Sequence, residues 1–109
     1  MEKKDIFLKA FVARIDGNTV QDKQQLMKTL AAAFRFPAYF GENWDALADC
    51  LRSLPEEMEE YSCFILEIEN FETFLSESPV VRKDFEEVFM DAADFVAQAY
   101  GKRLFAVML

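Results

Sequence analysis

The stretch FPAYFGENWDALADC, residues 36–50, lies near the middle of the 109-residue chain and predicts a loop that turns into a helix. Pro37 cannot continue a helix that precedes it, and it restricts Phe36 to extended conformations. After Gly41 the apolar residues recur at helical spacing, at Trp44, Leu47, Leu51 and Leu54. We expect this helix to end at Pro55.

On the N-terminal side of this stretch, the sequence predicts a strand, a turn and a helix. The segment IFLKAFVARI is too apolar for a solvent-facing strand, so we expect a mostly buried strand that ends near Ile15. The turn is formed by residues 16–18, Asp-Gly-Asn. Asp22 and Gln25 resemble a capping box. The helix that follows has apolar residues at helical spacing, at Leu26, Met27, Leu30 and Phe34.

On the C-terminal side, the run EEMEE at residues 56–60 predicts a charged, exposed connection. The segment SCFILEIEN at residues 62–70 alternates in the way that is typical of a strand with one largely apolar face, made of Phe64, Leu66 and Ile68. We expect Asn70 to cap a short helix over residues 71–75.

The longest helix is predicted from about Val80 to Tyr100, with Ser78 as its N-cap and Pro79 at its first position. Gly101 ends it, and RLFAVML at residues 103–109 is the last predicted strand. The residues of this helix expected to face the core are Phe85, Val88, Phe89, Ala92, Phe95, Val96 and Ala99.

The order of elements is therefore strand, two helices, strand, two helices, strand. Long helical connections favour parallel strands joined in the right-handed sense. Three strands with helices of this length indicate an α/β fold, a two-layer sandwich. A chain of this length supports one hydrophobic core, so we expect a single domain over residues 1–109.

The formal net charge is −8, from 20 acidic and 12 basic residues. Nucleic acid is an unfavourable ligand for such a chain, because binding phosphates needs clustered lysine and arginine. The charge favours a basic protein partner, although it could also serve solubility alone. No apolar stretch is long enough for a membrane span and no secretory signal is visible, so we expect a cytoplasmic protein. Cys50 and Cys63 are then expected to be reduced, buried thiols.

Several kinds of chemistry are disfavoured by composition. The chain has no histidine, which removes Ser-His, Cys-His and imidazole-metal sites. Cys50 has no base near it in the sequence, and the three glycines are too widely spaced for a phosphate-binding loop. We therefore expect no catalytic residue and no cofactor.

Asp45 and Asp49 lie one helical turn apart, on the side opposite Leu47 and Leu51. Two carboxylates on one exposed face satisfy little of a metal coordination shell, and Arg52 could pair with Asp49 on a solvated face. The preceding loop adds Tyr39, Phe40, Gly41 and Asn43 to the same region. An aromatic ring with a polar tip beside carboxylates suits recognition of a basic side chain. Phe40 has no polar group and is expected to join the core.

The motif FPAYFGENWDALADCL resembles the signature of the barstar family of intracellular ribonuclease inhibitors. The resemblance extends from about Val12 to Leu109. It includes the turn at residues 15–17, Leu26 with Thr29 and Leu30, Leu66 and Glu67 with Phe71, residues 89–92, and Gly101. It implies a three-stranded parallel sheet in the order 1-2-3, with the helices on one side.

The resemblance also implies a function, inhibition of a guanyl-specific, barnase-type ribonuclease of the basic extracellular type. The second helix and the loop before it would plug the enzyme's active site. In this reading Asp49 takes the place of the RNA phosphate, Asp45 is a second carboxylate, and Tyr39 packs on a catalytic imidazole. The other residues that the resemblance places at the contact are Gly41, Asn43, Ala48 and Asp91.

The chain departs from the family pattern at four positions. Ala48 stands where the family has a tryptophan, and Trp44 stands in a leucine position on the inner face of the helix. Asp91 replaces a glutamate, and Lys102 replaces a second cysteine.

Other interpretations remain open at this point. The chain could be an interaction or regulatory module with a non-nuclease partner, or a carboxylate metalloenzyme. Self-association through the uncovered face of the sheet is compatible with each of these, although we expect a monomer when the protein is free. The further acidic residues of the long helix, Asp84, Glu87 and Asp94, are expected to form its solvated face.

Overall fold

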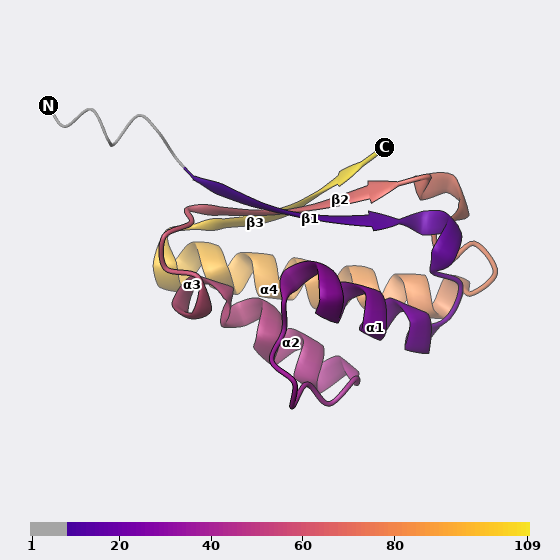
Figure 1. Cartoon of the computed structure of the whole chain (residues 1–109), viewed down its shortest axis with the longest axis horizontal. Helices are drawn as coiled ribbons and strands as arrows, with labels where there is room; N and C mark the ends of the chain where they lie inside the picture. Colours follow the sequence, from indigo (N-terminus) through magenta and orange to yellow (C-terminus); the bar gives the residue numbers. More distant parts are fainter. Residues whose placement is uncertain (1–8) are drawn as a thin grey trace, which may run out of the picture.

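A computed structural model describes residues 9–109, and in this part of the chain three parallel strands form one sheet in the order β1-β2-β3. The strands are β1 (Ala10–Asp16), β2 (Cys63–Glu69) and β3 (Arg103–Met108). Figure 1 shows the helices lying against one side of this sheet. The parallel arrangement, the strand order and the two-layer α/β architecture are therefore confirmed. Residues 6–8 of the first predicted strand lie outside the described residues.

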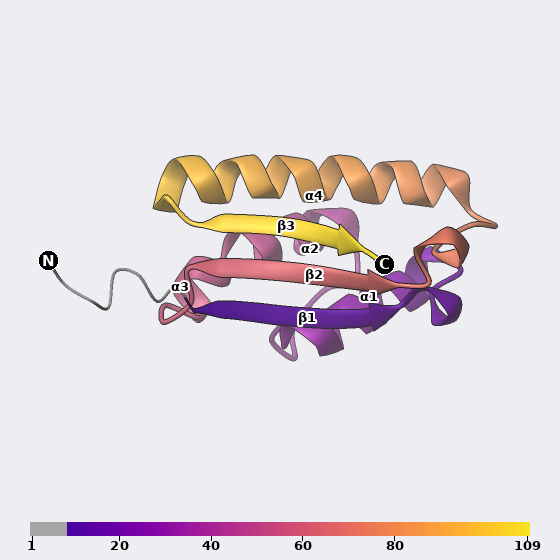
Figure 2. The same cartoon turned by 90° about the horizontal axis from the view of Figure 1, so that it is seen from above.

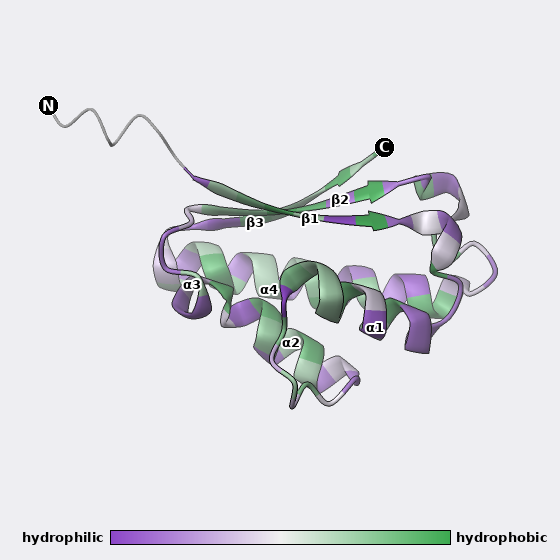
Figure 3. Ribbon diagram, in the orientation of Figure 1, coloured by the Kyte–Doolittle hydropathy of each residue, from purple (hydrophilic) through white to green (hydrophobic). Residues whose placement is uncertain are grey.

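The helices connect these strands on one side. They are α1 (Lys23–Phe34), α2 (Trp44–Arg52), α3 (Leu54–Glu57) and α4 (Pro79–Tyr100), with 3-10 turns η2 (Gly17–Thr19) and η3 (Phe71–Thr73) at one end of the sheet. Seen from above, α4 runs along β3, and α1 lies on the side of β1 (Figure 2). Figure 3 shows hydrophobic and hydrophilic residues alternating along each helix, as an amphipathic helix requires.

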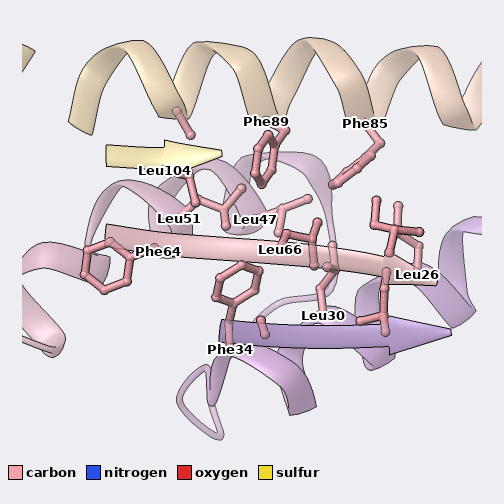
Figure 4. Close-up of a cluster of buried hydrophobic side chains, with 14 of the residues drawn as sticks. Leu26, Leu30, Phe34, Leu47, Leu51, Phe64, Leu66, Phe85, Phe89 and Leu104 are labelled. Carbon is pink, nitrogen blue, oxygen red and sulfur yellow. The ribbon is translucent and has the colours of Figure 1, made fainter. Parts of the chain in front are cut away.

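The register of the sheet explains which residues enter the core. Ala13, Leu66 and Ala106 are paired across the three strands, so they share one face, and Ala13 and Leu66 are buried there. The helices supply the opposite side of the same core (Figure 4), through buried Leu30 and Phe34 of α1, Leu47 and Leu51 of α2, and Phe85 and Phe89 of α4.

The other face of the sheet carries the alternate residues, and no helix of residues 9–109 covers it. Its central row consists of Val12, Ile65 and Phe105, all partly exposed. Beside this row Arg14 Nε lies 2.9 Å from Glu67 Oε1, so an ion pair links β1 to β2 across the face. The guanidinium of Arg103 lies 5.8 Å from the Phe105 ring.

The helix boundaries differ from the prediction around Pro55. α2 ends at Arg52, and Pro55 belongs to the first turn of α3, which includes part of the run predicted as an exposed connection. Proline is compatible with a first helical turn because the N–H that it lacks has no partner there. The prediction that α2 ends at Pro55 is therefore wrong, although Glu56 and Glu57 are exposed as expected.

Three capping predictions have different outcomes. Asp22 is the N-cap of α1 and accepts a hydrogen bond from the Gln25 N–H at 2.8 Å, as predicted. Asn70 does not cap by its side chain: its backbone is left-handed, and its amide donates to Asp16 Oδ1 at 2.9 Å. Ser78 precedes α4 as predicted, but its hydroxyl donates to the Gln21 carbonyl at 2.8 Å instead of capping the helix. In both cases a long-range partner replaces the local one.

Two residues of α4 predicted to be in the core are exposed. Phe95 is 40% exposed, since it lies roughly 90° around the helix from the centre of the buried stripe at a rotation of about 100° per residue. Ala99 is in the last turn, beyond Val96, the last buried residue of the helix.

The prediction of buried thiols is also wrong. Cys50 and Cys63 are free but only half-buried. Cys63 precedes buried Phe64 on β2 and therefore lies on the face of the sheet away from the helices. Cys50 lies on the flank of α2 beside its buried stripe.

Gly17 should be intolerant of a side chain, because a Cβ there would lie 2.5 Å from the Asn70 carbonyl oxygen and 2.9 Å from that of Glu69. These are backbone atoms and cannot rotate away. We expect Gly17→Ala to lower the free energy of unfolding by about 1–3 kcal/mol, as overpacking does. Urea denaturation measures this, with Gly41→Ala as the control, since a Cβ at Gly41 meets only side-chain atoms, Asn43 Nδ2 at 3.2 Å and Ala46 Cβ at 3.5 Å. Equal midpoints for the two variants would contradict the prediction.

The Asp16 carboxylate should make stability depend on acid pH. Hydrogen bonds from the Asn70 amide and the Asn18 N–H lower the pKa of Asp16 from its ordinary value of 3.8. A lowered folded-state pKa gives stabilisation that is present above the unfolded-state value and is lost as the pH falls through the folded-state value. We expect Asn70→Gly, which keeps the left-handed backbone, to lose less stability between neutral and acid pH than the wild type. Thermal unfolding of both proteins across this pH range tests the expectation. If their melting temperatures fell in parallel as the pH was lowered, the hydrogen bond between Asn70 and Asp16 would not contribute.

Candidate functional site

The loop between α1 and α2 is attached to the core by aromatic rings. Phe36 stacks on Phe34 of α1, with ring centroids 5.7 Å apart and planes at 9°, and Phe40 packs on Phe36 at 5.1 Å. Phe34 is fully buried, so both loop rings are joined to the core, and the role predicted for Phe40 is confirmed. Tyr39, between them, points outward and is 83% exposed. The loop therefore presents one tyrosine from a fixed backbone.

The residues that follow this loop start α2. The backbone of Glu42 is in the left-handed region, with a φ of 52°, whereas the backbone of Gly41 is not in that region. Asn43 is the N-cap: its side-chain oxygen accepts a hydrogen bond from the Ala46 N–H at 2.8 Å, and its amide nitrogen donates to the Gly41 carbonyl at 3.3 Å. Sequence reasoning missed this capping role, although asparagine before a helical pattern is a known signal for it.

The exposed side of α2 carries the two aspartates. Leu47 and Leu51 are fully buried in the core (Figure 4) and α2 packs on α4, which fixes the rotation of the helix. Asp45 and Asp49 are consequently exposed, and Ala48 is half-buried next to them. Asp45 also lies in the first turn, where a carboxylate stabilises the helix dipole.

The pair that Asp49 could make with Arg52 is not formed. Within residues 9–109 the ion pairs are Arg14 with Glu67 and Arg82 with Glu86. The Arg52 guanidinium instead lies 5.1 Å from the ring of Phe95 on α4. The aspartates of α2 thus have no neutralising ion pair in the described part of the chain.

Asp91 comes from the neighbouring helix. α2 packs on α4, and Asp91 lies one turn before Phe95, the residue that contacts Arg52. Residues four apart share a helix face, so Asp91 is on the side of α4 that is turned toward α2, and it is exposed. Trp44 is partly buried against the core, with Lys23 Nζ 5.3 Å from its ring.

The residues that bear on metal binding and on nucleophilic chemistry are the acidic side chains and Cys50. Among the residues that the structure describes, no three acidic or cysteine side chains are close enough to hold a metal ion. Burial raises the pKa of the Cys50 thiol, and the negative charges of Asp49 and Glu57 raise it further. A thiol with a raised pKa is a poor nucleophile at neutral pH.

The fold and this surface define a small acidic α/β protein that exposes carboxylates, an aromatic loop and a half-buried helix flank. The model of one family, described as Barstar (barnase inhibitor), matches residues 10–108. The chain belongs to the barstar family. This family consists of ribonuclease inhibitors and not of enzymes, and it implies a ribonuclease as protein partner.

No curated protein matches the sequence closely enough to serve as a named relative. In the described part of the chain, none of the helices combines the length and the apolarity that crossing a membrane would require.

Replacing Asn43 should separate its structural role from any role in binding. Asn43→Ala removes the oxygen that caps α2, so we expect it to lower the free energy of unfolding by about 1 kcal/mol. Asn43→Asp keeps a capping oxygen and adds a charge that is favourable at a helix N-terminus, so it should remain close to the wild type. Chemical denaturation of the three proteins measures this. If the alanine and aspartate variants had the same stability, the cap would not contribute.

Proposed function

We propose that this protein is a cytoplasmic inhibitor of a basic, barnase-type ribonuclease and protects the cell that makes it. The observation that supports this proposal is the orientation of α2. Because Leu47 and Leu51 are buried, Asp45 and Asp49 point outward. Catalytic sites that cleave RNA present positive groups to a phosphate. A rigid helix with outward carboxylates can occupy such a site in place of the substrate.

The residues of the surface take distinct roles in this proposal. Asp49 occupies the central phosphate position, and Asp45 meets a second group of basic side chains. The exposed ring of Tyr39 packs on an imidazole of the enzyme. Gly41 and Asn43 approach closely through the backbone and the amide, and Asp91 contributes a carboxylate from α4. Ala48 leaves more space beside Asp49 than the tryptophan of the family pattern.

The conformation of Gly41 supports a close approach at that position. Its backbone is not in the left-handed region, and a Cβ would meet only Asn43 and Ala46, at 3.2 Å and 3.5 Å. The fold of the chain therefore does not require glycine at position 41. A partner that packs directly on the backbone would require it, because a side chain there would keep the two surfaces apart.

The net charge of −8 supports fast association with a basic enzyme. Complementary charges accelerate encounter, and salt screens them over a Debye length of about 8–10 Å. The proposed complex should accordingly form more slowly and bind more weakly at high salt.

Titration calorimetry with a catalytically disabled barnase-type ribonuclease tests the proposal. Asp49→Ala should weaken binding by about 2–5 kcal/mol, the cost of leaving buried basic groups unpaired. Glu72→Ala is the matched control, because it removes an equal charge from the exposed turn η3 that follows β2. It should change binding little once salt is raised.

Two outcomes would count against the proposal in different ways. If Asp49→Ala bound as tightly as the wild type, the assignment of the site would be wrong. If the wild type bound no ribonuclease, and affinity capture returned a partner that is not a nuclease, the inhibitor function itself would be wrong.

A further inference from the structure

A cavity of about 430 Å³ opens beside Asp49, between the loop that follows α1 and the junction of α2 with α3. Its aromatic walls include Phe36, Tyr39 and Tyr61. Its carboxylates are Asp49, Glu57 and Glu60. Because Tyr39 and Asp49 also belong to the proposed contact surface, the cavity is continuous with that surface.

Two of the aromatic walls of the cavity, Phe36 and Tyr61, are held by packing that does not depend on a ligand. Phe36 stacks on buried Phe34, and Tyr61 meets Phe11 edge to face at 5.5 Å. Tyr61 also packs on buried Phe64, at 6.4 Å. A binding site whose walls are already ordered does not need to be ordered by its occupant.

The charges around the cavity favour a cation. The lining of the cavity has three acidic residues, Asp49, Glu57 and Glu60, and one basic residue, Arg35. The Arg35 guanidinium lies 5.3 Å from the Phe11 ring, so it already has an aromatic partner. The surroundings are therefore rich in carboxylates and in ring faces.

Among protein side chains, arginine fits this combination best. Its planar guanidinium stacks on aromatic rings and forms paired hydrogen bonds with a carboxylate. Lysine offers a point charge without a planar surface. The volume lies within the range of roughly 300–1,000 Å³ that is typical of ligand pockets, so one long side chain and its water can enter.

We infer that this cavity receives an arginine side chain of the bound protein, as a second anchoring point beside the contact made by Asp45 and Asp49. The inference rests on the proposed function, since the arginine belongs to the ribonuclease. It also gives a role to Glu57 and Glu60, which the sequence alone assigned to a charged connection.

The test uses two double variants in one run of sequence. Glu57→Gln with Glu60→Gln removes the two charges that line the cavity. Glu56→Gln with Glu59→Gln removes two charges from the same segment that do not line it. Both pairs are exposed, so both proteins should fold, and thermal unfolding checks this. Each is titrated against the catalytically disabled ribonuclease in high salt, where long-range attraction is screened.

We expect the cavity pair of substitutions to weaken binding at least tenfold and the control pair to weaken it less than twofold. Replacing each surface arginine of the ribonuclease with alanine should then reveal one whose loss has no further effect in the Glu57→Gln, Glu60→Gln background. Such coupling between two substitutions identifies a direct contact.

The results separate this inference from the proposed function. If the wild type binds tightly and the two double variants weaken binding equally, or if no arginine is coupled to the cavity, the inference is overturned while the inhibitor function stands. If the wild type does not bind the ribonuclease, and affinity capture returns a partner that is not a nuclease, both are overturned. Cavity variants that alter self-association of the free protein would assign the cavity to a second copy of the chain instead.

Discussion

The burial of Leu47 and Leu51 is the interaction on which the arrangement of the acidic surface depends. Both side chains are fully buried, and α2 packs against α4. A nine-residue helix is too short to be stable alone, so its tertiary contacts and its cap maintain it. These contacts also set its rotation, because turning the helix would expose two leucines. Apolar packing on one side thereby determines where the carboxylates stand on the other.

The same principle applies to the loop before α2. A segment with proline, glycine and three aromatic residues would be mobile if it were only a connection. Here Phe36 and Phe40 continue a series of ring contacts that begins at buried Phe34, and the left-handed Glu42 with the Asn43 cap fixes the entry to the helix. The surface is ordered before any partner arrives, which reduces the entropy lost on binding.

The sequence predicted the parts of this structure that depend on local patterns. Apolar runs and long helical connections indicated three parallel strands, and Asp22, Gly101 and the 3.6-residue periodicity located most helix ends. Two failures come from contact between distant residues: Asn70 and Ser78 bind Asp16 and Gln21 instead of capping. Phe95 fails for a local reason, because it lies off the centre of the buried stripe of α4. The cavity beside Asp49 could not be predicted either, because its walls come from three separate segments.

The ion pair between Arg14 and Glu67 has a consequence for the solubility of the fold. It lies beside the apolar row of Val12, Ile65 and Phe105, on the face of the sheet that no helix of residues 9–109 covers. Stacking a second sheet on this face would remove both charges from water, and that desolvation can exceed their mutual attraction. Two charged side chains beside this apolar row thus oppose the face-to-face stacking by which exposed sheets aggregate.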